Sequence, residues 1–303
     1  MKRLRTLLWL LGLLFCAAVV VLVLLPQIQI RSVRPPLPEA VSLQATPVDA
    51  GPISVSYLNT SSQRAPGRAL AHPAYLLEWA DGRRFLIDAG MEAAAAEAFG
   101  LLLERMWDAQ PQKFHGSVAD QLGSELAQVR GIGFTHLHID HVQGAGALCE
   151  RQPALTVFQT TAQHSTHNRN TTEGAAVLRN CPNAQVLDGR TLTPVPGFPG
   201  LAMQTLGGHT PGSTLFAAAV GSRVYLFTGD ITNSKAALLA NQPKAWWYSY
   251  LAVPEDTART AQLRERFAAL DAQTPFSVVV AHDLPPPELG IEPFSAPSRK
   301  RAQ

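Results

Sequence analysis

The chain has 303 residues, of which 46% are hydrophobic and 16% are charged. This composition provides a substantial core and excludes a disordered chain, which would be richer in charge and poorer in aliphatic residues. Three cysteines exclude a disulfide-rich scaffold and a cysteine-rich zinc module. With the eight basic residues near the two ends set aside, 17 basic and 23 acidic residues remain, a charge of about −6 that argues against nucleic acid as a partner.

The first 30 residues contain an apolar run typical of a membrane span. Leu7 to Leu25 holds nineteen residues without a charge. As a helix this run would be about 28 Å long, close to the hydrocarbon thickness of a bilayer. It exceeds the apolar core of an ordinary signal peptide, and no small-x-small cleavage site follows it in 26–30. We therefore expect residues 1–30 to be an uncleaved anchor that contacts the membrane through 7–25, with a cleaved signal peptide as the alternative.

Charges on either side of this run predict its orientation. Lys2, Arg3 and Arg5 precede the run, and Arg31 and Arg34 follow it. The more basic flank stays in the cytoplasm, so the body of the chain is expected on the other side, in the periplasm.

A proline-rich segment separates the apolar run from the body. Residues 31–47 include the sequence RPPLP at 34–38, which is stiff, extended and expected to hold the body off the membrane. Residues 48–295 show neither a repeat nor a second linker and are expected to form one domain. A basic tail follows at 296–303.

Five short apolar runs in the body each end in a polar residue that can do chemistry. They are expected to be strands, at 84–87, 131–134, 201–206, 224–228 and 276–281. Helices are expected at 92–110, 117–128 and 258–272. Strand ends that share one rim of a sheet are where sites are built in layered α/β proteins.

Three of the nine histidines fall within six residues, in the pattern His136-x-His138-x-Asp140-His141. Side chains two apart in an extended segment point the same way, so His136 and His138 can converge on one cation. Asp140 and His141 follow as the chain turns and can serve a second cation. Imidazole and carboxylate ligands together favour Zn²⁺ or a similar transition metal, and open positions make such a site catalytic rather than structural.

This motif resembles that of the metallo-β-lactamase superfamily, which adds a downstream His, an Asp and a final His, each on a loop after a strand. The chain offers His209 in GGHTPGS, Asp230 in TGD and His282 after VVVA. Asp88 in LIDAG matches the family's early Asp-x-Gly. The resemblance spans roughly residues 53–283 and departs from the family at position 143, where Gln replaces a common Gly.

The resemblance implies a fold, a ligand set and a mechanism. The fold would be α+β, a four-layer αββα sandwich with two metal ions, expected to be Zn²⁺, at one edge. The first ion would be bound by His136, His138 and His209, the second by Asp140, His141 and His282, with Asp230 bridging both and Asp88 supporting the ligands from behind. A hydroxide between the ions would be the nucleophile, and Asp140 would orient it and carry a proton to the leaving group.

Two positions narrow the class of reaction that we expect. His138 stands where family members with di-iron redox chemistry carry Glu, which favours hydrolysis. Asp230 stands where several true β-lactamases have Cys or no ligand, which resembles the lactonase, glyoxalase II and phosphodiesterase branches. The segment after His282 is too short for the helical domain expected of glyoxalase II. We expect a hydrolase acting on a small molecule with an ester-like bond, a lactone or thioester. The alternatives are β-lactam or phosphodiester hydrolysis at the same site, and a non-catalytic binding protein on the same fold.

An aromatic cluster follows Asp230, made of Trp246, Trp247, Tyr248 and Tyr250. These side chains are either core or the wall of a substrate pocket in which Tyr248 or Tyr250 donates to an oxyanion.

Five further residues each allow two interpretations. His164 and His167 are expected at the surface or at a pocket rim rather than on a metal. Cys149 and Cys181 either form a disulfide, if the body lies outside the cytoplasm, or remain free thiols. Asp283, beside His282, is expected behind the metal ligands.

Overall fold

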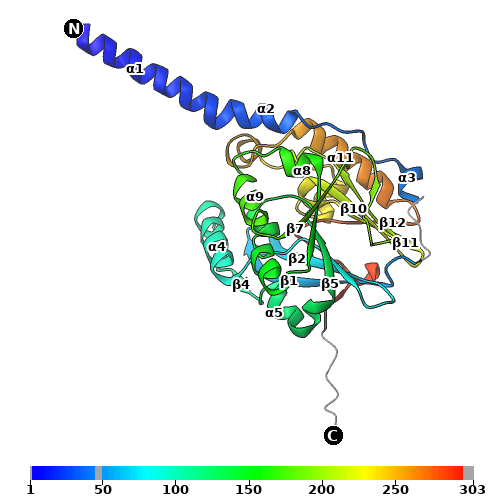
Figure 1. Ribbon diagram of the computed structural model, residues 1–303. Coiled ribbons are helices and arrows are strands. Elements are labelled where there is room, and N and C mark those ends of the chain that lie inside the picture. The colour runs from blue at the N-terminus through cyan, green and yellow to red at the C-terminus, as the bar shows by residue number, and fades with distance from the viewer. Residues whose placement is uncertain (1, 45–49, 296–303) are drawn as a thin grey trace.

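The computed structural model describes residues 2–44 and 50–295 (Figure 1). Two β-sheets pack face to face and carry helices on their outer faces, so the predicted αββα sandwich is confirmed. The larger sheet has the order β13-β1-β2-β3-β5-β6-β7, with β4 paired to β1. Its strands are β1 Ser54–Ala65, β2 Arg68–Glu78, β3 Arg84–Ile87, β4 Lys113–Phe114, β5 Val129–Gly133, β6 Thr156–Thr160, β7 Asn183–Leu187 and β13 Glu292–Pro293.

The smaller sheet has the order β12-β11-β10-β9-β8. Its strands are β8 Thr193–Pro194, β9 Leu201–Thr205, β10 Thr214–Val220, β11 Arg223–Phe227 and β12 Phe276–Val279. The helices that accompany the larger sheet are α4 Ala93–Trp107, α5 Val118–Leu122, α6 Ile139–Val142, α7 Ala145–Arg151, α8 Thr161–Ser165 and α9 Thr172–Leu178. Those that follow β11 are α10 Lys235–Leu239 and α11 Thr257–Asp271, and short helical turns lie at η2 Gly123–Gln128, η3 Gly229–Ile231, η4 Tyr248–Ala252 and η5 Pro287–Leu289.

Apolar side chains fill three layers, one between the sheets and one beneath each outer set of helices. Within β3, Phe85 points into the layer between the sheets, whereas Leu86 points into the layer under the helices. In β11, Phe227 and Leu226 divide in the same way. Both faces of these strands are buried, which is why they occur in the sequence as continuous apolar runs.

The strand directions bring chemically capable residues to one rim. β3 and β5 are parallel, as are β11 and β12, and β9 runs the same way as β11 because both are antiparallel to β10. The five strands predicted from the sequence are therefore the ones whose carboxyl ends carry the candidate ligands. The predicted helix over 117–128 is in fact α5 followed by η2, because Gly123 takes a positive φ of 52° and ends the α-helix.

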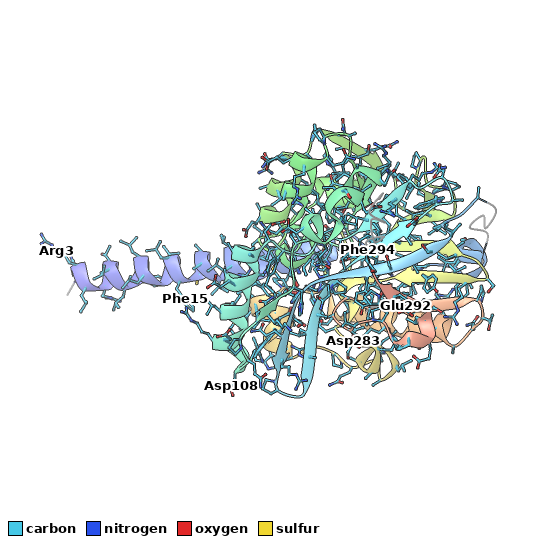
Figure 2. All side chains as sticks on the ribbon, turned by 90° about the horizontal axis from the view of Figure 1, so that it is seen from below. Arg3, Phe15, Asp108, Asp283, Glu292 and Phe294 are labelled. Atoms are coloured by element: carbon cyan, nitrogen blue, oxygen red, sulfur yellow. A yellow bond between two sulfur atoms is a disulfide. The ribbon has the colours of Figure 1, made fainter. Side chains whose placement is uncertain are left out.

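The N-terminal helix is continuous from Lys2 to Arg31, as α1 Lys2–Val19, the π-helical turn η1 Val20–Leu24 and α2 Leu25–Arg31. It is long and apolar enough to cross a membrane, a property that signal sequences share. α1 projects away from the body in both views (Figures 1 and 2), so its apolar side chains have no protein partner among the described residues.

The proline-rich segment that follows is extended, but it packs on the body instead of running free as a spacer. It lies along α11 (Figure 1). Arg34 Nη2 is 2.6 Å from Asp256 Oδ2, and Arg259 Nη2 donates a 2.7 Å hydrogen bond to the Pro35 carbonyl. Extended backbone of this kind has no internal partner for its carbonyls, so the arginines of α11 can bind it. Residues 45–47 of the predicted linker and the predicted tail at 296–303 lie outside the described residues.

Cys149 and Cys181 form a disulfide that joins α7 to the turn after α9, so the two alternatives for these residues are resolved. The bond closes a loop with a sequence separation of 32 residues.

Replacing both cysteines, as Cys149→Ser with Cys181→Ser, should lower the free energy of unfolding by about 3 kcal/mol, because the loop then gains freedom in the unfolded chain. Chemical denaturation followed by circular dichroism measures this change. Cys16→Ser, which alters the exposed free cysteine of α1, is the matched control and should leave the unfolding free energy unchanged. Equal stability of the double variant and the control would contradict the expectation.

Candidate metal centre

The seven sequence-predicted ligands meet at the rim where the central strands end. His136 and His138 lie after β5, and Asp140 and His141 lie on α6 immediately beyond. The other three, His209, Asp230 and His282, follow β9, β11 and β12. Glycines at 207 and 208, with φ of 66° and 88°, allow the sharp turn that brings the histidine after β9 back toward the rim.

Three histidines form the first ligand group. His138 Nδ1 lies 3.1 Å from His136 Nε2 and 3.1 Å from His209 Nε2. Ligand atoms about 2.0–2.1 Å from a tetrahedral zinc ion are separated by roughly 3.4 Å. The spacing of these three nitrogens therefore fits one cation.

Asp230 lies between this group and a second one. Its Oδ2 is 3.6 Å from His209 Nε2 and 3.2 Å from His282 Nε2, and its Oδ1 is 3.2 Å from His282 Nε2 and 3.5 Å from His141 Nε2. Asp140 Oδ2 completes the second group, 3.7 Å from both His141 Nε2 and His282 Nε2. One carboxylate thus faces two sets of ligands, which is the arrangement of a bridging ligand.

Groups behind the imidazoles fix their orientation. His141 Nδ1 lies 2.9 Å from Asp88 Oδ2, His209 Nδ1 lies 2.5 Å from Glu255 Oε1, and His282 Nδ1 lies 2.9 Å from the Ala71 carbonyl. Each contact holds the proton on Nδ1 and leaves the Nε2 lone pair facing the centre.

Several buried atoms at the centre lack a hydrogen-bond partner, and two of them face each other. Within the described part of the chain, His141 Nε2 and Asp230 Oδ1 have none. A buried polar atom without a partner is unfavourable, and a cation at this point would satisfy both. The donor set of five imidazoles and two carboxylates fits a pair of divalent transition-metal ions.

Burial and neighbouring charges shift the histidine pKa values of the two groups in different directions. Burial, with repulsion from His209, lowers the pKa of His138 to about 3, and the pKa of His136 is lowered for similar reasons. Burial alone would also lower the pKa of His141, but the Asp140 and Asp88 carboxylates outweigh it and raise that pKa well above its usual value. In the metal-free chain the first group is therefore neutral, whereas His141 carries a proton.

Metal binding at the second group should weaken as the pH falls. Burial would also lower the pKa of His282, but Asp230 outweighs it and raises that pKa, so protons must leave His141 and His282 before their Nε2 atoms can bind. Affinity should therefore fall by at least about tenfold per pH unit below the raised pKa values. The first group is already neutral, and its affinity should stay nearly constant between about pH 8 and pH 6. Zinc titration against a chelator at the two pH values measures both binding steps. Equal weakening of both steps would contradict this assignment.

His72 is part of the site although no sequence pattern points to it. It is a buried residue of β2, with Nδ1 3.5 Å from Asp140 Oδ2 and its ring centroid 5.1 Å from that of His282. Among the described residues neither of its ring nitrogens has a hydrogen-bond partner. Its ligand atom lies within 4.8 Å of those of Asp140 and His282.

A buried ion pair supports the first group and was also not predicted. Glu255, which contacts His209, accepts a 2.9 Å hydrogen bond from Lys244 Nζ. Burial raises the pKa of Glu255, but Lys244 and His209 outweigh it and lower that pKa to about 2. The carboxylate therefore stays ionised and holds the His209 ring.

A cavity of about 570 Å³ leads to the second group between α4 and η4. Its inner end is formed by His72, His138, Asp140, Asp230 and His282, and its apolar wall by Leu70, Phe99, Leu102, Leu103, Met106, Trp107 and Val253. Of the predicted aromatic cluster, Tyr248 lines the cavity, where its ring centroid is 5.7 Å from that of Trp107.

Other predicted positions lie away from this cavity. Trp246, Trp247 and Tyr250 are exposed and do not line it, so the structure does not bring the four aromatics together. His164 is exposed, and His167 is half-buried with Nε2 3.0 Å from the His164 carbonyl. Asp283 does not lie behind the metal ligands, because it accepts a hydrogen bond from the Lys235 backbone at the start of α10.

The fold and the cluster of candidate metal ligands are those of a metal-dependent hydrolase. Residues 67–267 match the model of the metallo-β-lactamase superfamily, so the chain belongs to this family. No curated protein sequence matches the chain.

Solved structures share the fold at low sequence identity. An N-acyl homoserine lactone hydrolase, with N-hexanoyl-L-homoserine at its catalytic metal centre, is 17% identical, with 80% of this chain and 98% of that one covered and a TM-score of 0.59. A B. thuringiensis enzyme with N-decanoyl-L-homoserine at its active site is 18% identical, with the same coverage and a TM-score of 0.59. A dizinc quorum-quenching lactonase is 18% identical over 71% of this chain and 73% of that one, with a TM-score of 0.51.

Proposed function

We propose that this protein is a membrane-anchored hydrolase that uses two divalent ions, Zn²⁺ in the first instance, to open ester-like bonds, with lactones as the leading substrate class. The observation that carries the proposal is the Asp230 carboxylate, which contacts His209 of one ligand group and His141 and His282 of the other at the inner end of a cavity. An apolar wall beside polar groups suits a small molecule with an acyl chain. The lactone-cleaving structures that share the fold support this class.

The ions would be held by the residues that the family motif implies, with His136, His138 and His209 in one group and Asp140, His141 and His282 in the other. When bound, they would supply Lewis acidity and lower the pKa of water at the site. Asp230 would bridge them, and Asp88 would keep the His141 ring in place.

Asp140 has the properties of a proton carrier. Burial raises its pKa, but His141 and His72 outweigh that effect and hold it well below its usual value, so the carboxylate is ionised. It would accept the proton of the attacking water and deliver it to the ester oxygen as the carbon–oxygen bond breaks. Tyr248 lines the same cavity, and burial together with the Glu255 carboxylate raises its pKa well above 10. Its phenol therefore stays protonated and would donate to the oxygen that gains negative charge.

His138→Ala and Asp230→Ala should each lower lactone hydrolysis by at least about a thousandfold and remove at least one ion. The zinc-loaded full chain in detergent is assayed by acid release in a pH-stat on a panel of lactones and thioesters, with metal content measured on the same samples. His164→Ala, at an exposed histidine outside the site, is the matched control. Full activity in both ligand variants would overturn the proposal.

We assign His72 to the metal site as a further residue of the second group. His72→Ala should weaken metal binding there by about tenfold to a hundredfold and leave the three-histidine group unchanged. Chelator competition measures the two affinities. His72→Gln should restore binding if the residue acts by hydrogen bonding to Asp140, but not if the imidazole binds the ion. A loss of stability in the metal-free variant, without a change in affinity, would show a structural role instead.

Three observations support an uncleaved anchor with the body outside the cytoplasm. The helix that contains the apolar run continues into α2, where Pro26, Gln27 and Ile30 are buried against the body. The segment that follows the span is thus part of the folded domain. The disulfide between Cys149 and Cys181 is typical of an oxidising compartment.

A further inference from the structure

We propose that the mouth of the cavity is seated in the membrane that holds α1, so that the site takes amphiphilic substrates from the bilayer: esters or lactones that carry a long apolar chain. This inference rests on the proposed function and names the substrate class of the same site. It depends on where the mouth lies along the axis of the N-terminal helix.

Two hydrogen bonds of Arg169 show which part of the cavity wall lies beside the membrane span. Pro26 lacks an N–H and cannot bond to the Leu22 carbonyl one turn earlier, and Arg169 Nη1 donates to this carbonyl at 3.0 Å instead. The other terminal nitrogen of the same guanidinium, Nη2, donates to the Leu251 carbonyl at the end of η4. Leu22 lies about 5 Å inside the end of the apolar run at Leu25. Leu251 is therefore at the level of the boundary between hydrocarbon and lipid headgroups.

A second contact fixes the same register. Gln27 is buried, and its Nε2 donates to the Ser249 carbonyl at 3.1 Å and lies 3.4 Å from the Tyr250 carbonyl. The turn η4 is thus held against the helix on two sides of Pro26. The cavity wall at η4 is therefore fixed at the same depth as the C-terminal end of the membrane span.

Exposed apolar side chains lie on or next to both elements that flank the cavity, α4 and η4. We call them the apolar collar: Leu102 and Met106 on α4, with Trp246, Tyr250 and Leu251 in and next to η4. Their exposed fractions run from 42% for Tyr250 to 71% for Trp246. The C-terminal end of α4, marked by Asp108, lies on the side of the body from which α1 projects (Figure 2). Exposed apolar groups with aromatic residues among them are typical of a membrane interface.

The collar is continuous with the cavity. Leu102 and Met106 belong to both, and Tyr248 on the opposite wall precedes the collar residues of η4. An apolar chain could therefore pass from the bilayer between α4 and η4 along this apolar wall, while its ester group reached the metal ligands at the inner end; Arg169, Asn170 and Glu173 also line the cavity. A second copy of the chain on the collar is the competing occupant, and the depth measurement below distinguishes the two.

The depth of the collar can be measured without activity. The full chain with Cys16→Ser is reconstituted in vesicles of phosphatidylcholine and phosphatidylglycerol, and nitroxide labels are placed at Trp246→Cys or Leu251→Cys. Ile53→Cys is the matched control, because Ile53 is also an exposed apolar residue. It lies at one end of the β1–β2 hairpin, whereas Arg68, which packs on Trp107 of α4, lies at the other end. Labels at 246 and 251 should be accessible to oxygen dissolved in lipid, and the control to a water-soluble nickel chelate. Aqueous accessibility, or shielding from both reagents as in a protein contact, at 246 and 251 would overturn the proposal.

Two lactones with the same ring, one with a hexanoyl and one with a hexadecanoyl chain, test the consequence in the same vesicles. Leu251→Glu should lower turnover of the bilayer-held hexadecanoyl lactone by about tenfold or more and leave the soluble hexanoyl lactone unaffected, because the charge lifts the mouth from the lipid. Ile53→Glu should change neither rate.

The two proposals fail in different ways. Lipid-exposed labels with neither lactone hydrolysed would reject lactone hydrolysis and leave the membrane seating in place. Hydrolysis of the hexanoyl lactone with water-exposed labels would reject the seating and leave the hydrolase in place. Equal loss of both lactone activities in Leu251→Glu would show damage to the site and contradict selective delivery from the bilayer.

Discussion

The Asp230 carboxylate is buried between the imidazoles of His141, His209 and His282 and the Lys244 ammonium, and these neighbours keep it ionised. Burial would raise the pKa of this carboxyl, but the charges of His282 and Lys244 hold it well below its usual value. A buried anion is tolerated only when its partners are fixed. The strands that end at this rim, the carboxylates behind the histidines and the glycine turn before His209 all fix those partners. Much of the local structure is thus explained by the need to stabilise one buried charge.

How much the sequence could predict depended on how local each signal was. His136, His138 and Asp140 lie within six consecutive residues, so the motif alone locates these ligands. The strands that precede the ligands are buried on both faces, so they can be predicted as continuous apolar runs. His72 and Glu255 are single residues on elements that carry no motif. Their roles arise only when the long hairpin and the loop before α11 fold onto the rim. A fold-level contact of this kind leaves no trace in spacing or composition.

The proline-rich segment and the aromatic cluster show the same limit. Proline content predicts an extended backbone, and the segment is extended, but composition cannot tell that the arginines of α11 will bind its carbonyls. Nor can it tell which aromatic turns inward. Tyr248 lies in the π-helical turn η4, and only its side chain among the four reaches the cavity. In both cases the sequence predicted the kind of backbone or side chain, but not which residues it would contact.

A chain of contacts runs from the end of the N-terminal helix to the first ligand group. Gln27 donates to the Ser249 carbonyl, Ser249 Oγ donates to Glu255 Oε2 at 2.6 Å, and the other oxygen of Glu255 holds His209. A protease that released the body on the N-terminal side of Gln27 would leave this chain whole. A cut a few residues later would remove its first member and free the turn that carries Tyr248. Bodies released by the two cuts would thus differ in how firmly the first ligand group is held, although the cuts lie only a few residues apart.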